Sequence, residues 1–349
     1  MINAYAAMTP ASSLVPFTYD PGPLGSDEVE IQVAYCGICQ SDVSMIDNEW
    51  GRSSYPLVAG HEVVGSVARV GAAVTTLQAG DQVGLGWHAG YCMQCTQCAT
   101  GEHNLCLAVQ PTIIGRHGGF ADRVRAAAAS VVPLPSDIDL TRAGPLFCGG
   151  ITVFNPLLQY AVQPTDRVGV IGIGGLGHMA LKFLKAWGCD VTAFTSSASK
   201  VDDALAMGAS HTIDSTDPAA LARHANTFDL ILSTVDASLD WGAYLGTLKP
   251  KGRLHFVGIP TQALELNVIA LLRSQKAVSA SPVGSPQAIA AMLAFASRHA
   301  IQPEIELFPA ARINDAIERL RSGQARYRVV VDMTANSNAG SKPTPLGQS

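Results

Sequence analysis

The chain has 349 residues, of which 48% are hydrophobic and 15% charged, and its formal net charge is −5. This size and composition predict about two globular domains rather than a disordered chain. The mild negative charge, without a basic run, argues against a nucleic-acid partner. We find no secretory signal and no apolar run of about 18 residues that would span a membrane. We therefore expect a cytoplasmic protein.

The first third of the chain has the pattern of a β-rich domain. Residues 29–35, VEIQVAY, alternate between apolar and polar side chains, which predicts a strand. Residues 61–71, HEVVGSVARVG, and residues 80–86, GDQVGLG, look like two further strands closed by glycine.

From about residue 166 the pattern changes to strands that alternate with helices. Residues 166–188 predict a buried strand, a glycine turn and a helix, and residues 190–196 and 199–209 repeat the pair. This alternation predicts a parallel, doubly wound sheet. Helices are expected at 286–299 and 310–322, followed by a last strand at 327–333. We expect the polar tail, 334–349, to be disordered.

Four of the eight cysteines lie in one short loop, as Cys92, Cys95, Cys98 and Cys106. Zinc binds four such thiolates in a tetrahedron, which makes a closed, structural site. In a reducing compartment this arrangement favours a metal over disulfides. An iron–sulfur cluster competes less well, because the bacterial spacing ends in Cys-Pro and Leu107 follows the last cysteine here. A loop of free thiols is the remaining alternative.

A glycine motif follows the strand that begins near residue 166. Gly172, Gly174 and Gly177, with Gly175 and Leu176 between them, form G-x-G-x-x-G between a strand and a helix. In that context the glycines let a pyrophosphate approach the backbone and the helix N-terminus. The alternative is a glycine turn that serves packing alone.

The end of the next strand indicates which dinucleotide binds. A site for NAD usually has a carboxylate about 20 residues after the glycines, to bond the ribose 2′-OH. Here that place holds Thr195, Ser196 and Ser197, with Lys200 close behind. Hydroxyls and an ammonium suit a 2′-phosphate, so we predict NADPH over NADH. Alternatively, Lys200 only extends into solvent.

Several further motifs are far apart in the sequence, and they indicate a site only when they are considered together. C-G-I-C-x-S-D, G-H-E, the four-cysteine loop, C-x-G-I-T and G-I-G-G-L-G-H occur in the order seen in zinc-dependent medium-chain alcohol dehydrogenases. Over roughly residues 25–333 the chain resembles the cinnamyl alcohol dehydrogenase branch, including its NADPH-dependent aldehyde reductases.

The resemblance implies a fold of two domains. A GroES-like catalytic domain would comprise residues 1–150 and 287–349, with a structural zinc lobe at 88–106. A Rossmann NADP-binding domain would comprise residues 151–286. The implied cofactors are NADP(H) and two zinc ions per chain, one of them in the four-cysteine loop.

The resemblance also implies a catalytic zinc site. Its ligands would be Cys39, His61 and Cys148, with an open fourth position for water or substrate. Glu62 would lie behind the metal, where it can exchange with a ligand, and Asp42 would hydrogen-bond to His61. The remaining cysteines, Cys36 and Cys189, are then expected in the hydrophobic core.

Other roles carry over in the same way. Ser41 matches the hydroxyl that relays the proton, Thr152 a residue that packs on the nicotinamide, and Arg328 one that contacts the pyrophosphate. Trp50 matches an aromatic wall of the substrate pocket, and His88 replaces a wall residue that is usually apolar. The alternatives are a plain turn serine for Ser41 and a surface arginine for Arg328, while His88 could bond a substrate hydroxyl or carboxylate or serve packing alone.

The chain departs from its relatives at two positions of the relay. Gln40 stands where many relatives have histidine or arginine, and Ser44 where many have histidine. Proton exit is then expected through the ribose hydroxyls and water instead.

The implied reaction interconverts aldehydes, aromatic or medium aliphatic, and primary alcohols. Zinc polarises the substrate oxygen and the nicotinamide carries the hydride. The alternatives are a zinc-free quinone reductase, a non-catalytic NADPH-binding zinc protein and a zinc-ribbon nucleic-acid binder. A zinc-free quinone reductase would lack the metal ligands that this chain has. A zinc-ribbon nucleic-acid binder would not explain the Rossmann half. The family implies a homodimer or homotetramer.

Overall fold

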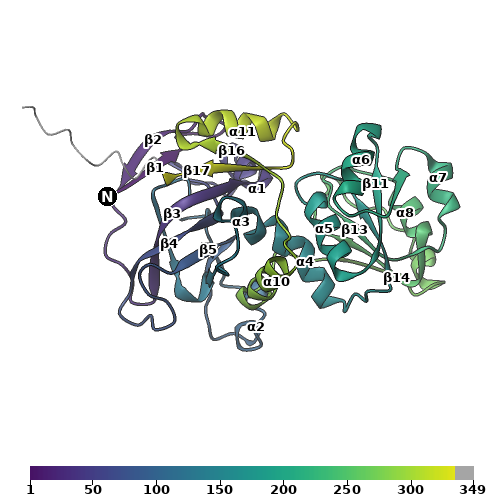
Figure 1. The fold of residues 1–349 in the computed structure, drawn as a ribbon, viewed down its shortest axis with the longest axis horizontal. Helices are drawn as coiled ribbons and strands as arrows, with labels where there is room; N and C mark the ends of the chain where they lie inside the picture. The colour runs from purple at the N-terminus through teal and green to yellow at the C-terminus, as the bar shows by residue number, and fades with distance from the viewer. Residues whose placement is uncertain (335–349) are drawn as a thin grey trace, which may run out of the picture. The chain divides into compact units, whose positions relative to one another are not determined.

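The computed structural model describes residues 1–334 of the chain, so all but the first residue of the predicted tail lies outside it. These residues form two compact units. The first contains Met1–Cys148, Ser285–Ala290 and the chain from Glu304 onward, and the second contains Gly149–Gly284 and Ala291–Pro303. Each unit is built around its own main β-sheet (Figure 1).

The first unit is β-rich, as predicted. Its main sheet has the strand order β16-β17-β3-β4-β5-β9, with β8 also paired to β3. The strands of this unit are β1 (Ile2–Ala6), β2 (Val15–Tyr19), β3 (Glu28–Ile38), β4 (Glu62–Val70), β5 (Gln82–Leu85), β6 (His88–Gly90), β7 (Gln110–Pro111), β8 (Arg123–Ala127), β9 (Val131–Pro133), β16 (Ile305–Pro309) and β17 (Arg328–Asp332). β3, β4 and β5 are the three strands expected from the alternating sequence.

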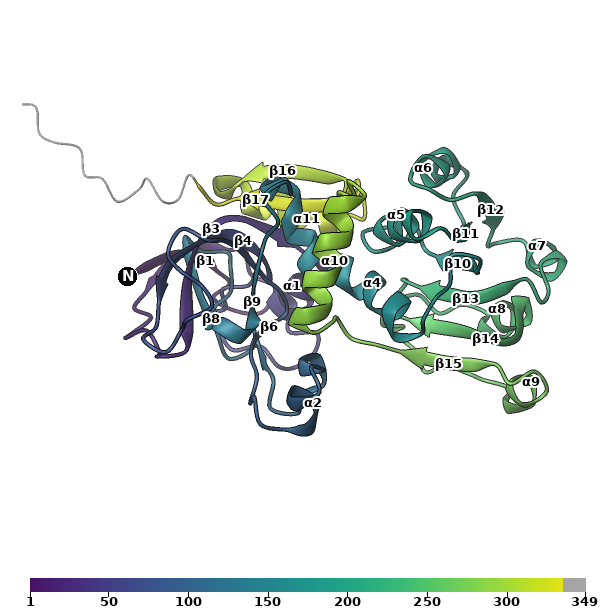
Figure 2. The same cartoon turned by 60° about the horizontal axis from the view of Figure 1, so that its bottom comes forward.

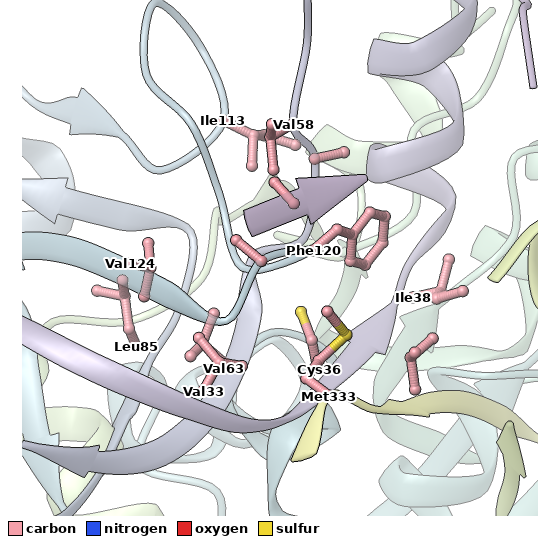
Figure 3. Packing of buried hydrophobic residues seen from close by; sticks show 14 of the residues in the cluster. Val33, Cys36, Ile38, Val58, Val63, Leu85, Ile113, Phe120, Val124 and Met333 are labelled. Atoms are coloured by element: carbon pink, nitrogen blue, oxygen red, sulfur yellow. The ribbon is translucent and has the colours of Figure 1, made fainter. Parts of the chain in front are cut away.

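Apolar side chains of these strands and of neighbouring loops form the core of the first unit. Figure 3 shows Cys36 of β3 among Val63, Phe120 and Met333, all fully buried. Removing the Phe120 ring would cost about 3–5 kcal/mol, as for other buried aromatics. Cys36 therefore acts as a small core residue, which confirms the prediction, and Cys189 of the second unit is also buried.

Short helices complete the first unit. They are α1 (Gln40–Asp47), α2 (Thr96–Ala99), α3 (Leu140–Ala143) and α11 (Ile313–Arg321), with a 3₁₀ turn at Gly144–Phe147 just before Cys148. Helix α10 (Pro286–Arg298) begins in the first unit and ends in the second.

The second unit contains the predicted parallel, doubly wound sheet. The strand order is β12-β11-β10-β13-β14-β15, and every neighbouring pair is parallel (Figure 2). The strands are β10 (Arg167–Ile171), β11 (Asp190–Thr195), β12 (His211–Asp214), β13 (Phe228–Ser233), β14 (Leu248–Phe256) and β15 (Ala277–Ala280). The helices are α4 (Gly149–Gln159), α5 (Gly177–Trp187), α6 (Val201–Ala206), α7 (Pro218–Arg223), α8 (Trp241–Thr247) and α9 (Val268–Leu272).

The topology of this sheet indicates where a ligand binds. The chain runs outward from β10 to β12 and then crosses back to β13, on the other side of β10. In such sheets ligands bind at the carboxyl ends of the strands, where the order reverses. The ends of β10 and β13 form that point here. Among residues 1–334 no helix is long and apolar enough to span a bilayer.

Candidate active site

Asp42 holds Cys39 and His61 in place. Cys39 precedes α1, and its backbone N–H donates to Asp42 Oδ2 at 2.9 Å, as in a capping box. Asp42 Oδ1 accepts from the backbone N–H of Gly60 at 2.8 Å and lies 2.9 Å from His61 Nδ1. Gly60 has φ +96°, and a Cβ there would lie 2.6 Å from the Phe120 ring, so the turn before His61 requires glycine.

The Asp42 carboxylate also determines the His61 tautomer. Asp42 and His61 are fully buried. Because a carboxylate only accepts hydrogen bonds, we assign the ring proton to Nδ1. The Nε2 lone pair is then free, and Nε2 lies 3.2 Å from the Cys148 sulfur. This is the usual arrangement behind a metal-ligating histidine.

The side chains of Cys39, His61 and Cys148 fit a zinc ion. Their ligand atoms, with one oxygen of Glu62, all lie within 4.8 Å of one another. The two sulfurs are 3.8 Å apart. That separation equals the spacing, about 3.8 Å, of two sulfurs each 2.3 Å from a tetrahedral zinc. The hydrogen bond between the two thiols lowers the pKa of Cys39 and raises the pKa of Cys148.

Glu62 and Arg328 form a buried ion pair beside these ligands. The Arg328 guanidinium donates to Glu62 Oε1, and both side chains are at least 94% buried. Within the described chain Glu62 Oε2 has no hydrogen-bond partner. Burial raises the pKa of Glu62 to about 7, although the Arg328 charge lowers it. Glu62 thus lies with the ligands as expected, and Arg328, expected at the pyrophosphate, pairs with Glu62.

Trp87, which the sequence analysis missed, packs on the metal ligands. Its ring stands edge-on to His61 at 4.9 Å and contacts Trp50 at 5.9 Å. The ring of the neighbouring His88 packs instead on Tyr91, at 5.6 Å. Burial lowers the pKa of His88 to about 4, so it is neutral. The structure brings Trp50 together with His61 through Trp87 and does not bring His88 to this group.

The four-cysteine loop forms a second metal-ligand group. The sulfurs of Cys92, Cys95, Cys98 and Cys106 lie within 4.8 Å of one another. Cys92 is 4.0 Å from Cys98 and 3.5 Å from Cys106, and all four are free thiols. Disulfides would bring the sulfurs to about 2.05 Å. Four thiols around one point fit a closed zinc site with no place for a substrate.

The glycine turn after β10 has the geometry of a dinucleotide site. Gly172 has φ +85°, and a Cβ on Gly177, the first residue of α5, would collide with the Gly172 carbonyl. Gly174 is different, because a Cβ there would meet no atom within 4 Å. Its backbone is therefore open to a ligand, in front of the α5 N-terminus.

A cavity of about 440 Å³ adjoins this turn. The predicted residues in its wall are Gly172, Gly174, Gly175, Leu176, Thr195, Ser196, Ser197 and Lys200. The Lys200 ammonium donates to the Ile173 carbonyl at 3.0 Å, so this lysine bends over the glycine turn. Residues 195–200, at the end of β11, include no carboxylate, and Asp236 is the carboxylate among the lining residues. The cavity fits a dinucleotide with an anionic group at that end.

Three predicted cofactor residues, Thr152, Gly177 and Arg328, are outside this wall, and others were missed. Gly177 opens α5, and Thr152 is a buried residue of α4. The wall also contains Ser215, after β12, and Tyr244 of α8. Ser215 could have been found from the topology, because it follows the strand next to β11 and ligands bind at such strand ends.

Comparison with known proteins identifies the family of the chain. Residues 25–136 match the family model "Alcohol dehydrogenase GroES-like domain", and residues 175–298 match "Zinc-binding dehydrogenase". The curated aldehyde reductase AdhA of a Synechocystis species is 58% identical, over 96% of this chain and all of the relative. Cinnamyl alcohol dehydrogenase 7 of Arabidopsis thaliana is 40% identical, over 97% of both chains.

Solved structures give the same result. A cinnamyl alcohol dehydrogenase from Sorghum bicolor is 39% identical, with a TM-score of 0.91 over 99% of both chains. An enzyme of this kind from Helicobacter pylori, described as complexed with NADP(H), is 31% identical, with a TM-score of 0.88 over 95% of this chain and 98% of the other.

A buried Cys₂His metal group and a dinucleotide cavity define a zinc-dependent oxidoreductase. The chain belongs to the zinc-dependent medium-chain alcohol dehydrogenase family, within its cinnamyl alcohol dehydrogenase branch. Its cofactors are zinc and NADP(H). The predicted fold, GroES-like and Rossmann, is confirmed, and nothing favours the non-catalytic alternative.

Proposed function

We propose that this chain reduces aldehydes to primary alcohols with NADPH, and catalyses the reverse oxidation, at Cys39, His61 and Cys148. The observation that carries the proposal is the buried ligand group, with two thiols and an imidazole that Asp42 orients. When bound, zinc supplies Lewis acidity toward the substrate oxygen, and NADPH supplies the hydride. The resemblance to a named aldehyde reductase supports the same reaction class.

The residues of this ligand group are arranged for zinc in three ways. With zinc bound, Cys39 and Cys148 would supply negative charge as thiolates, and His61 would be a neutral ligand because Asp42 holds its proton on Nδ1. Glu62, with one oxygen bonded to Arg328 and the other unpaired, lies within reach of the same point. With Cys39, His61 and Cys148 as the ligands and Glu62 paired to Arg328, the fourth position of a tetrahedral zinc would be open for the substrate oxygen.

We assign the proton relay to Ser41. Its hydroxyl oxygen lies 3.9 Å from the Cys39 sulfur, next to the position where a substrate oxygen would bind. We do not extend the relay through Ser44, whose hydroxyl is engaged with Glu49 at 2.6 Å, or through Gln40, which is exposed. We therefore assign proton exit to the ribose hydroxyls and water.

Aromatic and medium aliphatic aldehydes are the proposed substrates. Trp87 and Trp50 present flat, apolar rings beside His61. Such rings favour planar, conjugated substrates of the cinnamaldehyde type. The names of the relatives from Arabidopsis and Sorghum, cinnamyl alcohol dehydrogenases, support this choice.

We further propose a cytoplasmic homodimer or homotetramer, with Arg328 and Thr152 retained as cofactor contacts. Helix α9 supports self-association, because Val268, Ile269 and Leu272 are each at least 58% exposed. The eight free cysteines suit a reducing compartment. Size-exclusion chromatography with light scattering would give the state of assembly.

The test compares two single cysteine substitutions. We expect Cys148→Ser to bind one zinc fewer per chain and to lose NADPH oxidation with cinnamaldehyde. Cys189→Ser is the matched control, because Cys189 is buried in the second unit and belongs to neither ligand group. It should keep both zinc ions and the full rate. Full activity of Cys148→Ser with its zinc content reduced would refute the proposed site.

A further inference from the structure

The dinucleotide cavity extends past the end of β11 to residues with no assigned role. The next strand, β12, ends beside β11, and the Ser215 backbone N–H donates to the Thr195 carbonyl at 3.1 Å. Ser215, Thr216 and Tyr244 all line the cavity there. Ser215 and Thr216 follow β12, one strand further from the glycine turn than the proposed 2′-phosphate site, and Tyr244 of α8 lies beside Ser215.

Tyr244 carries an unpaired hydroxyl into this part of the cavity. The side chain is 2% exposed, and its ring packs at 5.3 Å, nearly perpendicular, on Phe194. Among residues 1–334 its hydroxyl oxygen has no hydrogen-bond partner. Leaving a buried hydroxyl unpaired costs stability. A native structure that accepts this cost calls for an explanation, and a ligand that completes the bond provides one.

The hydroxyl is equipped to recognise a neutral group. Burial raises the pKa of Tyr244, although the Ser215 hydroxyl beside it lowers that pKa, so the phenol keeps its proton. It can therefore donate one hydrogen bond and accept another. The carboxylates of Asp214 and Asp240 are nearby and would repel a phosphate at this end. Val235 and Leu239 add apolar wall, which suits a flat heterocycle.

The order of the binding positions along the cavity identifies the heterocycle. The pyrophosphate belongs at Gly174, in front of the α5 N-terminus, and the adenosine ribose at the end of β11. The next group beyond this ribose in NADPH is adenine, which has nitrogen acceptors and an amino donor on its edges. We propose that the Tyr244 hydroxyl hydrogen-bonds to the adenine base, with Ser215 beside it, and so sets the affinity for adenine dinucleotides.

The inference rests on the proposed NADPH site at Ser196 and Lys200, because that site locates the ribose and hence the adenine in the cavity. It assigns Tyr244 to cofactor binding and not to the chemical step. A purely structural alternative exists, in which a small rotation pairs Tyr244 with Ser215 inside the free protein. The two differ in what removal of the hydroxyl does to the ligand-free fold.

The test is isothermal titration calorimetry with adenosine 2′,5′-bisphosphate, which contains the base and the 2′-phosphate but no nicotinamide. Tyr244→Phe keeps the ring on Phe194 and removes only the hydroxyl. The matched control is Tyr160→Phe, since Tyr160 lies in the same unit, against His255, and does not line the cavity.

We expect Tyr244→Phe to raise the Kd by roughly two- to tenfold, the range for one neutral hydrogen bond. Tyr160→Phe should leave the Kd unchanged. The thermal midpoint of ligand-free Tyr244→Phe should equal or exceed that of the wild type, because an unpaired buried hydroxyl has gone. An unchanged Kd overturns the proposal. A lower midpoint of the free variant also overturns it, whatever the Kd, since the hydroxyl then has a structural partner.

If the proposed preference for NADPH is wrong, the same calorimetry on the wild-type protein would show it. In that case wild-type protein would bind AMP as tightly as adenosine 2′,5′-bisphosphate. The ratio of Kd values between Tyr244→Phe and wild type is then measured with AMP, and the same two- to tenfold criterion applies.

Discussion

Replacing Asp42 by asparagine tests how the metal ligands are held. The carboxylate oxygens face three donors: the backbone N–H groups of Cys39 and Gly60, and His61 Nδ1. An asparagine has one oxygen, so its NH₂ must face at least one of these donors. One buried N–H left unpaired costs about 1–3 kcal/mol of unfolding free energy. The remaining bond to His61 also loses its charge.

The effect on zinc follows from the weaker support of His61. Loss of such a partner typically reduces metal affinity by about 10–100-fold. We therefore expect Asp42→Asn to release one zinc per chain at a chelator concentration that the wild type resists, and to retain the zinc of the four-cysteine loop. The assay is zinc content by mass spectrometry during chelator titration, with thermal denaturation in parallel.

Asp122→Asn separates this effect from general loss of stability. Asp122 is also buried, and its two oxygens accept from the backbone and side-chain nitrogens of Asn3 at 3.1 and 2.9 Å. It contacts neither ligand group, so the control should lose stability without weaker zinc binding. If Asp42→Asn and Asp122→Asn release zinc alike, Asp42 does not orient His61 and the reasoning is refuted.

Four further outcomes are expected. Ser41→Ala should lower the turnover number more than it raises the Kd for NADPH, and an unchanged turnover number would remove Ser41 from the relay. Gly174→Ala should keep the thermal midpoint, because a Cβ there meets nothing, yet weaken NADPH binding by filling the pyrophosphate approach; unchanged calorimetric affinity would contradict this. Ser196→Asp should shift kcat/KM from NADPH toward NADH, and retained preference for NADPH counts against the 2′-phosphate site. Burial lowers the pKa of His255 from 6.5 to about 4, so its stabilising effect is complete above pH 6.5 and lost as the pH falls to 4. The gap in thermal midpoint between wild type and His255→Asn should therefore narrow on acidification, and a constant gap would exclude this effect.

Most of the fold was predictable because local sequence patterns determine it. The glycine turn at Gly172 follows a buried strand and opens a helix, and both conditions are visible in the sequence. The cysteine spacing in the loop that ends at Cys106 likewise determines a ligand group almost alone. The catalytic group needed family resemblance, since Cys39, His61 and Cys148 meet only after the sheet of the first unit has folded.

Other side chains were harder to predict, because their roles depend on the direction in which they point rather than on the residue type. Adjacent residues of an extended segment point to opposite sides, so Trp87 packs on His61 while His88 packs on Tyr91. Tyr244 has the sequence signal of a core aromatic in a helix, and only the packing of α8 brings its hydroxyl to the cavity. Arg328 was singled out only through the family resemblance, and its pairing with Glu62 requires the registers of β17 on β3 and of β3 on β4.

The most direct test of the whole account is the initial rate of NADPH oxidation with cinnamaldehyde, measured beside NADH at equal concentration. The account predicts rapid oxidation of NADPH, slow oxidation of NADH, and loss of both rates when the catalytic zinc is removed. Turnover with NADH alone would contradict the roles of Thr195, Ser196 and Lys200. Absence of turnover with either cofactor, in protein that retains two zinc ions per chain, would contradict the proposed reduction of aromatic aldehydes.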